Sequence, residues 1–312
     1  MVAFLPFFIT FLICKSDVNL GSVNTIDLRL KTTITNNNNS YKNRTKDLVS
    51  KKNKSTKNNK PFFFVKDSIK TLVYLDSTSF NTREKFLSHW NMFYPWGTDH
   101  NGTARMYEEN VTIEANGVLK IKSEWVGKIN EGNSSKDPYL PIKFHSGAIH
   151  FKKQIKVTED FPFWTISGDF KSPTVPCSWP AFWITGVSSW PPEIDILEFK
   201  GSTKTLQNTV TGIDWKHTEW TTVETEIPNA DIEWHSYKLN LERLNDEYLT
   251  VKLYIEGQLR SKEVKNFTNK SFWLIINMQM EGASGITNEN SIVRLEPQYF
   301  FAKNVYVAAS NN

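Results

Sequence analysis

The stretch that decides the fold is Glu-Ile-Asp-Ile-Leu-Glu at residues 193–198. Acidic residues alternate there with branched apolar residues, a pattern typical of a β-strand. Side chains of a regular strand alternate between faces, so Glu193 and Asp195 share a face, whereas Glu198, at an odd offset, falls on the other. One extra residue held as a β-bulge would put all three acids on one side of the sheet. The alternative is a sheet with a water-facing acidic surface, and the hexapeptide alone leaves both interpretations open.

The rest of residues 62–312 indicates an all-β domain. Short apolar or alternating runs recur, separated by Gly, Asn, Asp and Pro. These runs are Val111–Ala115, Val118–Ser123, Gly147–Lys152, Trp164–Phe170, Tyr237–Leu241, Thr250–Ile255, Phe272–Met278 and Phe300–Val307. Such spacing predicts a β-sandwich or jelly roll. Asn116–Gly117 and Glu256–Gly257 predict hairpin turns, and helical periodicity is confined to residues 81–90.

The N-terminal part differs in composition from this domain. Residues 2–14 are almost uninterrupted apolar, too short to cross a bilayer of ~30 Å but suited to a secretory signal, so we expect a signal segment at residues 1–18. A lipid anchor at Cys14 stays an alternative. Residues 19–61, rich in Asn, Lys, Ser and Thr, predict a disordered linker, because they bury too little surface to offset ordering. We therefore expect an extracellular or cell-surface protein.

Charge and cysteine content exclude several classes of function. Residues 1–60 carry eleven Lys and Arg against three Asp, so the formal charge of +4 belongs to this segment, and the folded part carries no basic surface for nucleic acid. The two cysteines, Cys14 and Cys177, give no disulfide framework once a signal is cleaved. No Cys-pair zinc spacing, phosphate loop or Gly-x-Ser-x-Gly elbow is present. We expect no metal and no cofactor.

Tryptophans gather next to the acidic strand. Trp179, Trp183 and Trp190 fall within twelve residues, and indole rings beside carboxylates suit a sugar, whose C–H surface stacks while its hydroxyls take hydrogen bonds. For Trp183, between Phe182 and Ile184, a core position and a cleft position are equally compatible with the pattern. Trp190, next to two prolines in a loop, is predicted to lie in a cleft.

These motifs together resemble glycoside hydrolase family 16. The pattern Glu-x-Asp-x-x-Glu is similar to the family's bulged active-site strand, which accompanies laminarinases, agarases, porphyranases and carrageenases. Further similar segments, in family order, are Trp179–Trp183, Trp190–Glu193, His145–Ile149, Trp234–Tyr237 and Leu274–Met278 ahead of Gly282. The resemblance spans residues 72–308 and implies a jelly-roll β-sandwich of two curved antiparallel sheets, with a substrate cleft on the concave face. It implies that Glu193 is the nucleophile, Glu198 the acid/base and Asp195 an assistant between them, as a retaining hydrolase requires.

The resemblance also bears on the substrate. Pro192 stands where many laminarinases have Gly, and Ala148 where they have Arg, so β-1,3-glucan and β-galactan both stay open. Asn208 and Trp215 fall where the family lines its sugar subsites, although a strand Asn is more often an ordinary surface residue. Arg105 is a further candidate to meet a hydroxyl or sulfate, with a surface salt bridge as the alternative.

The sequence therefore predicts a secreted, monomeric, retaining endo-β-glycosidase that hydrolyses a β-linked polysaccharide. A non-catalytic carbohydrate-binding or adhesion protein on the same fold is the alternative, since a fold does not fix function. The complete set of three acids favours the enzyme.

Overall fold

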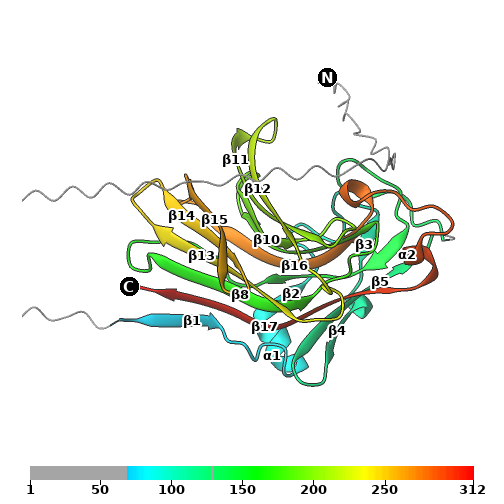
Figure 1. Cartoon of the computed structure of the whole chain (residues 1–312), viewed down its shortest axis with the longest axis horizontal. Helices are drawn as coiled ribbons and strands as arrows, with labels where there is room; N and C mark the ends of the chain where they lie inside the picture. The colour runs from blue at the N-terminus through cyan, green and yellow to red at the C-terminus, as the bar shows by residue number, and fades with distance from the viewer. Residues whose placement is uncertain (1–68, 128) are drawn as a thin grey trace, which may run out of the picture. The chain divides into compact units, whose positions relative to one another are not determined.

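The computed structural model describes residues 69–127 and 129–312 (Figure 1). The predicted signal segment at residues 1–18, the predicted linker at residues 19–61 and the first residues of the predicted domain lie outside this range. None of the helices in the described part of the chain is long and apolar enough to cross a membrane.

The larger of the two sheets has ten strands, in the order β15-β14-β13-β8-β17-β5-β6-β3, with β1 against β17 and β4 against β5. Its strands are β1 Thr71–Leu75, β3 Ala104–Met106, β4 Val111–Glu114, β5 Val118–Trp125, β6 Phe144–Ser146, β8 Phe163–Lys171, β13 His235–Arg243, β14 Leu249–Ile255, β15 Gln258–Lys265 and β17 Gln298–Ser310. β3 and β6 run parallel, whereas the other neighbours in the described part of this sheet run antiparallel.

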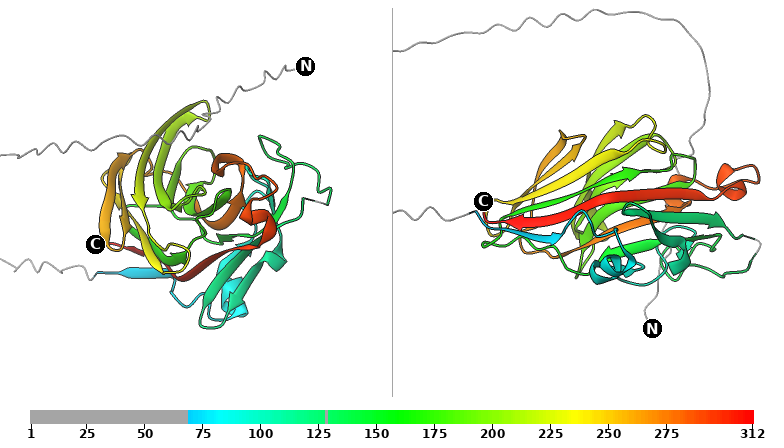
Figure 2. Two further views of the ribbon diagram at one scale, coloured as in Figure 1. Left: turned by 45° about the vertical axis from the view of Figure 1, so that its right-hand side comes forward. Right: turned by 90° about the horizontal axis from the view of Figure 1, so that it is seen from below.

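The second sheet has seven antiparallel strands, in the order β12-β11-β10-β9-β16-β7-β2. They are β2 Trp90–Met92, β7 Ala148–Phe151, β9 Ser178–Gly186, β10 Glu193–Glu198, β11 Lys204–Asp214, β12 His217–Glu226 and β16 Phe272–Met280. The views agree that this sheet curves over the first, and that the β11–β12 hairpin rises at its edge (Figures 1 and 2). The predicted jelly-roll sandwich is confirmed.

The helical elements among the described residues are short. They are α1 Arg83–His89, α2 Ile292–Leu295 and the 3₁₀ turns Glu108–Asn110 and Gly282–Ser284. Thr82 caps α1 by accepting a hydrogen bond from the Lys85 amide at 3.1 Å, which satisfies one of the free N–H groups of the first turn. The helix falls where the sequence indicated it.

The predicted hairpin turns are also confirmed. Asn116 and Gly117 join β4 to β5 with φ of 65° and 72°, and Glu256 and Gly257 join β14 to β15 with φ of 51° and 71°. Consecutive positive φ values match the twist of the flanking strands, which explains why Asn-Gly is a good signal for such a turn.

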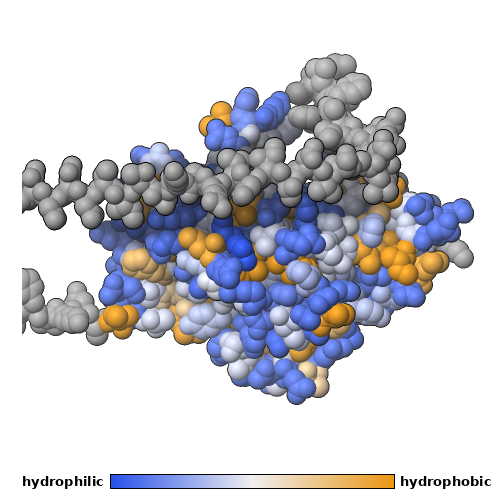
Figure 3. Space-filling model, viewed as in Figure 1, coloured by the Kyte–Doolittle hydropathy of each residue, from blue (hydrophilic) through white to orange (hydrophobic). Residues whose placement is uncertain are grey.

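The core lies between the sheets and is aromatic at its centre. Phe170 of β8 contacts Phe182 of β9 at 4.8 Å between ring centroids and Phe300 of β17 at 5.5 Å, so it joins the two sheets. β8 alternates buried and part-exposed residues, as expected for one packed face. In β9, by contrast, residues 178–185 are all buried, because one face packs in the core and the other lies under the walls of a cleft. On the face seen in Figure 3, hydrophilic residues predominate and apolar ones form small separate groups.

Candidate active site

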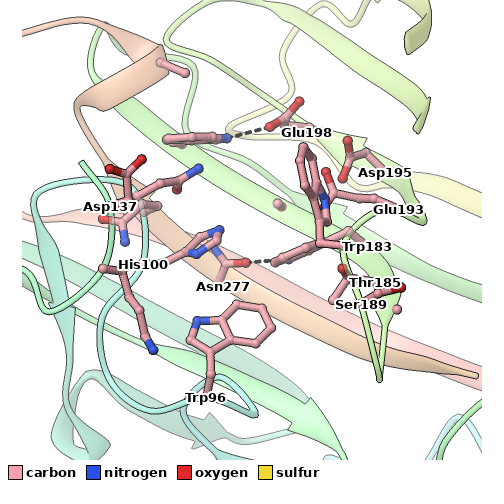
Figure 4. Close-up of a pocket in the computed structure, with 18 of the residues that line it drawn as sticks. Trp96, His100, Asp137, Trp183, Thr185, Ser189, Glu193, Asp195, Glu198 and Asn277 are labelled. Atoms are coloured by element: carbon pink, nitrogen blue, oxygen red, sulfur yellow. Dashed lines mark hydrogen bonds between the residues drawn. The ribbon is translucent and has the colours of Figure 1, made fainter. Parts of the chain in front are cut away.

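The acidic strand β10 contains the predicted bulge. Against β9, Glu193 and Asp195 pair in one register, and Leu197 and Glu198 continue one residue out of step, so Ile196 is the extra residue. The phase of the strand is thereby restored, and all three acids line one cleft. Figure 4 shows the three carboxyl groups close together on one side of this cleft.

The cleft has a volume of about 760 Å³. Its floor is the concave face of β9, β10 and β16, and its rims are the loop at residues 96–101, the segment Lys136–Asp137 and the β9–β10 loop. This volume fits the size of sites that enclose several rings of a ligand.

The carboxyl group of Glu198 faces three donors. The Trp179 Nε1–H donates to Oε1 at 2.7 Å, and the Asn208 Nδ2–H donates to Oε2 at 2.8 Å. The Lys200 ammonium lies 3.1 Å from Oε2 and 5.3 Å from the centre of the Trp179 ring. Glu198 is 6% exposed, so these contacts fix its orientation at the cleft surface.

Asn208 links two of the acids. Its Nδ2 also donates to Asp195 Oδ2 at 2.8 Å, and its own carbonyl accepts a hydrogen bond from the Thr222 hydroxyl at 2.8 Å. The Thr222 bond fixes which end of the amide faces the acids. Asn208 was predicted to bind substrate, but the structure buries it against Asp195 and Glu198.

Burial and mutual repulsion raise the pKa of two of the acids, Glu193 and Asp195. Burial, then the charge of Glu198, raises the pKa of Glu193 to about 8, against the lowering effects of a hydrogen bond from Trp190 and the charge of Lys200. Burial, then the charges of Glu193 and Glu198, raises the pKa of Asp195 well above its ordinary value. Glu193 and Asp195 therefore bind protons more tightly than isolated carboxyl groups would.

Aromatic side chains line the cleft beside the acids, beginning with Trp183, which is opposite Asp195 on the neighbouring strand. Trp183, only 5% exposed, donates from Nε1 to Asn277 Oδ1 at 2.7 Å, and its ring stacks on His100 at 5.8 Å. Trp96 packs edge-on against Trp183 at 6.1 Å. Burial lowers the pKa of His100 to about 4, so its ring is neutral. Trp183 therefore lies in the cleft, and Trp96, His100 and Asn277 are cleft residues that the sequence did not single out.

Two tryptophans stand near Glu193. Trp190 lines the cleft, is 38% exposed and donates from Nε1 to Glu193 Oε2 at 3.0 Å. Trp220 of β12 lines the cleft beside it. Trp215, which the sequence favoured, lies in the turn between β11 and β12, outside the residues that line the cleft.

Arg105 also lies outside the cleft. In β3 its Nε donates to Asp99 Oδ1 at 2.8 Å and one terminal nitrogen donates to Oδ2 at 3.1 Å. It further donates to the carbonyl oxygens of Glu131 and Asn133 at 2.9 and 3.1 Å. Arg105 ties the loop at residues 131–135 to the sandwich.

No cluster of three or more His, Cys, Asp or Glu side chains in the described part of the chain could hold a metal ion. The cleft contains groups suited to acid chemistry on a sugar: neighbouring carboxyl groups, two of them with raised pKa values, held by N–H donors and flanked by indole rings. Fold and site together define a glycoside hydrolase.

Comparisons with known proteins agree. No protein-family model matches the chain. A galactan endo-β-1,3-galactanase of Flammulina velutipes is 36% identical over 242 residues, covering 74% of this chain and 89% of that protein. The chain belongs to glycoside hydrolase family 16, and it is an endo-β-glycosidase acting on a β-linked polysaccharide.

Solved structures show the same fold. The LamAcat structure from Zobellia galactanivorans superposes with a TM-score of 0.53 at 22% identity, covering 72% of this chain and 91% of that one. An endo-1,3-β-glucanase from Streptomyces sioyaensis gives 0.55 at 18%, covering 72% and 90%. SCLam, a non-specific endo-β-1,3(4)-glucanase from family GH16, gives 0.56 at 18%, covering 76% and 91%.

Proposed function

We propose that the protein is a secreted, monomeric, retaining endo-β-glycosidase that cleaves β-1,3-linked galactan by double displacement. The assignment of the substrate rests on the 36% identity with a galactan endo-β-1,3-galactanase over 89% of that protein. Two residues that depart from the laminarinase pattern fit a substrate other than β-1,3-glucan. Pro192 directly precedes Glu193, and Ala148 is paired with Asn277 of the cleft floor, so both bear on the floor of the site.

In this mechanism Glu193 reacts in its ionised form, whose population rises as the pH approaches the pKa of about 8. Its carboxylate attacks the anomeric carbon of the sugar. The Trp190 N–H at 3.0 Å stabilises the attacking carboxylate and orients it. Asp195, whose pKa is raised by burial and by the charges of Glu193 and Glu198, assists from its position between the two glutamates. Glu198 protonates the leaving oxygen, so the glycosidic bond breaks as the glycosyl–Glu193 ester forms.

The second step reverses these roles. Glu198, now ionised, takes a proton from a water molecule that attacks the same anomeric carbon, and the ester to Glu193 breaks. Trp179, Asn208 and Lys200 hold the carboxylate of Glu198 in place between the two steps. Two inversions leave the anomeric configuration of the product unchanged.

The test is cleavage of a panel of β-1,3-galactan, laminarin, mixed-linkage glucan, agar, porphyran and carrageenan by the purified protein. We expect release of oligosaccharides from β-1,3-galactan, with the β-anomer formed first in time-resolved NMR. Cleavage of laminarin alone would overturn the substrate. Initial formation of the α-anomer would overturn the retaining mechanism, and a folded protein that cleaves nothing while still binding polysaccharide would favour the non-catalytic alternative.

Secretion and oligomeric state have their own tests. The apolar run at residues 2–14 supports export, so expression of the full chain in a secreting host should deliver a protein to the medium that lacks this run at its N-terminus. Retention inside the cells with the run intact would contradict it. Light scattering should give the mass of one chain.

A further inference from the structure

Trp220 occupies a position in the second sheet that the catalytic roles do not use. Glu193 of β10 is opposite Val210 of β11, and Val210 is opposite Trp220 of β12. Residues directly opposite one another in a sheet project to the same face, so Trp220 lies on the concave face in the same row as Glu193. β12 is the edge strand, and Val210 between them is fully buried.

The Trp220 ring is accessible from the cleft. It is 50% exposed and forms part of the cleft wall. Its centroid is 6.3 Å from that of Trp190, with the two planes tilted by 56°, and its Nε1 donates to the Thr218 hydroxyl at 3.3 Å. The ring is thus held by Trp190 and by a hydrogen bond, and half of its surface is left open to the cleft.

Trp215 offers an internal comparison on the same hairpin. It is 55% exposed, close to the value of Trp220. Trp215 lies, however, in a turn in which the Asp214 carboxylate accepts hydrogen bonds from the amides of Lys216 and His217 at 2.8 and 3.0 Å. The Lys216 ammonium lies 5.0 Å from the centre of the Trp215 ring. Two tryptophans of similar exposure therefore differ in whether they border the cleft.

We propose that Trp220 is a stacking platform for a sugar residue beyond the one that reacts with Glu193, which rests on the proposed endo-galactanase function. Trp220 is two strand spacings from Glu193, roughly 10 Å between backbones, further than one pyranose ring reaches. A galactosyl unit has an axial 4-hydroxyl on one face and a continuous C–H surface on the other, and this surface matches an open indole face. The platform selects for chain length and explains endo cleavage.

The test measures binding without turnover. In the Glu193→Gln protein, the affinity for β-1,3-galacto-oligosaccharides of increasing length is measured by titration calorimetry. We expect Trp220→Ala to weaken binding of the long oligosaccharides at least tenfold and to leave the disaccharide within twofold, with Trp220→Phe in between. Trp215→Ala should change neither. Because Trp220 is half exposed on an edge strand, its replacement leaves the fold intact, which circular dichroism checks.

The outcomes separate this inference from the proposed function. If the wild-type protein cleaves galactan but Trp220→Ala binds long and short oligosaccharides like its parent, or if Trp215→Ala has the same effect, the platform is wrong and the function stands. If Glu193→Gln binds laminari-oligosaccharides in a Trp220-dependent manner and no galacto-oligosaccharide, the platform stands and the galactan substrate is wrong. If Glu193→Gln binds neither galacto-oligosaccharides nor laminari-oligosaccharides, both the stacking platform and the proposed galactan substrate are wrong.

Discussion

Replacing Glu193 with Gln should make the protein inactive and more stable at neutral pH. The amide has the shape of the protonated carboxyl group and can still accept the Trp190 hydrogen bond, but it carries no charge. In the wild-type protein, ionisation of Glu193 places a charge in a crowded site beside Asp195 and Glu198. The arrangement of acids that the reaction needs therefore lowers the free energy of unfolding.

The magnitude follows from the pKa. It is about 8 in the folded protein against an ordinary value of 4.5, so the folded state holds this proton more tightly than the unfolded chain does. Between these values the folded state binds more protons than the unfolded state, and stability therefore falls as the pH rises from about 4.5 to about 8. At pH 7 this cost reaches at most about 3 kcal/mol, at about 1.4 kcal/mol per pH unit. Because Asp195 and Glu198 compete for the same protons, we expect Glu193→Gln to gain about 1–3 kcal/mol at pH 7.

The assay is urea unfolding of both proteins at several pH values between 4 and 8. The difference in unfolding free energy should grow with pH and vanish near pH 4, where Glu193 is protonated in both states. Glu219→Gln, the same change at an exposed position of β12, is the matched control and should stay within about 0.5 kcal/mol throughout. A Glu193→Gln protein that is less stable than the wild type at pH 7, or a gain that does not depend on pH, would refute the reasoning.

Two further predictions concern the groups around the acids. Asn208→Ala removes the amide that donates to both Asp195 and Glu198. We expect kcat to fall at least tenfold in steady-state kinetics and the unfolding free energy to fall by about 1–3 kcal/mol in urea unfolding. An unchanged kcat would contradict this prediction. Lys200→Met removes a positive charge that lowers the pKa values of Glu193 and Asp195. The acidic limb of the pH profile of kcat/KM should therefore move to higher pH. Lys200→Arg keeps the charge and should leave this limb in place.

The part of the site that could be predicted is the part in which neighbours in sequence are neighbours in space. The bulge in β10 follows from the odd offset between Glu193 and Glu198, because three acids can share a face only if one extra residue intervenes. The turn at residues 116–117 follows from local backbone chemistry. Trp190, three residues from Glu193, lies in the cleft for the same reason.

The remainder depends on register and packing between distant segments. His100 reaches Trp183 from a loop more than eighty positions earlier, and no local pattern marks it. The pairing of β11 with β12 separates Trp215 from Trp220. Trp215 lies in the turn, beyond a register shift after Gly212, whereas Trp220 is opposite Val210 on the concave face. Arg105 finds its carboxylate partner only six residues back, so its surroundings decide a role that its residue type left open.

The bulge also decides what stands opposite the acid/base. With Ile196 as the extra residue, Leu197 pairs with Phe182 and both are fully buried, while Glu198 pairs with Ala181, which lines the cleft. Without the bulge, Leu197 would face the cleft and Glu198 would be directed into the core. Burial of an ionised carboxylate without partners costs several kcal/mol, on the order of the whole unfolding free energy of a domain. The small side chain of Ala181 keeps the floor beside Glu198 low, and Trp183, two positions along β9, forms the wall next to it. A single added residue therefore aims the proton donor at the cleft and at the same time seals the core behind it.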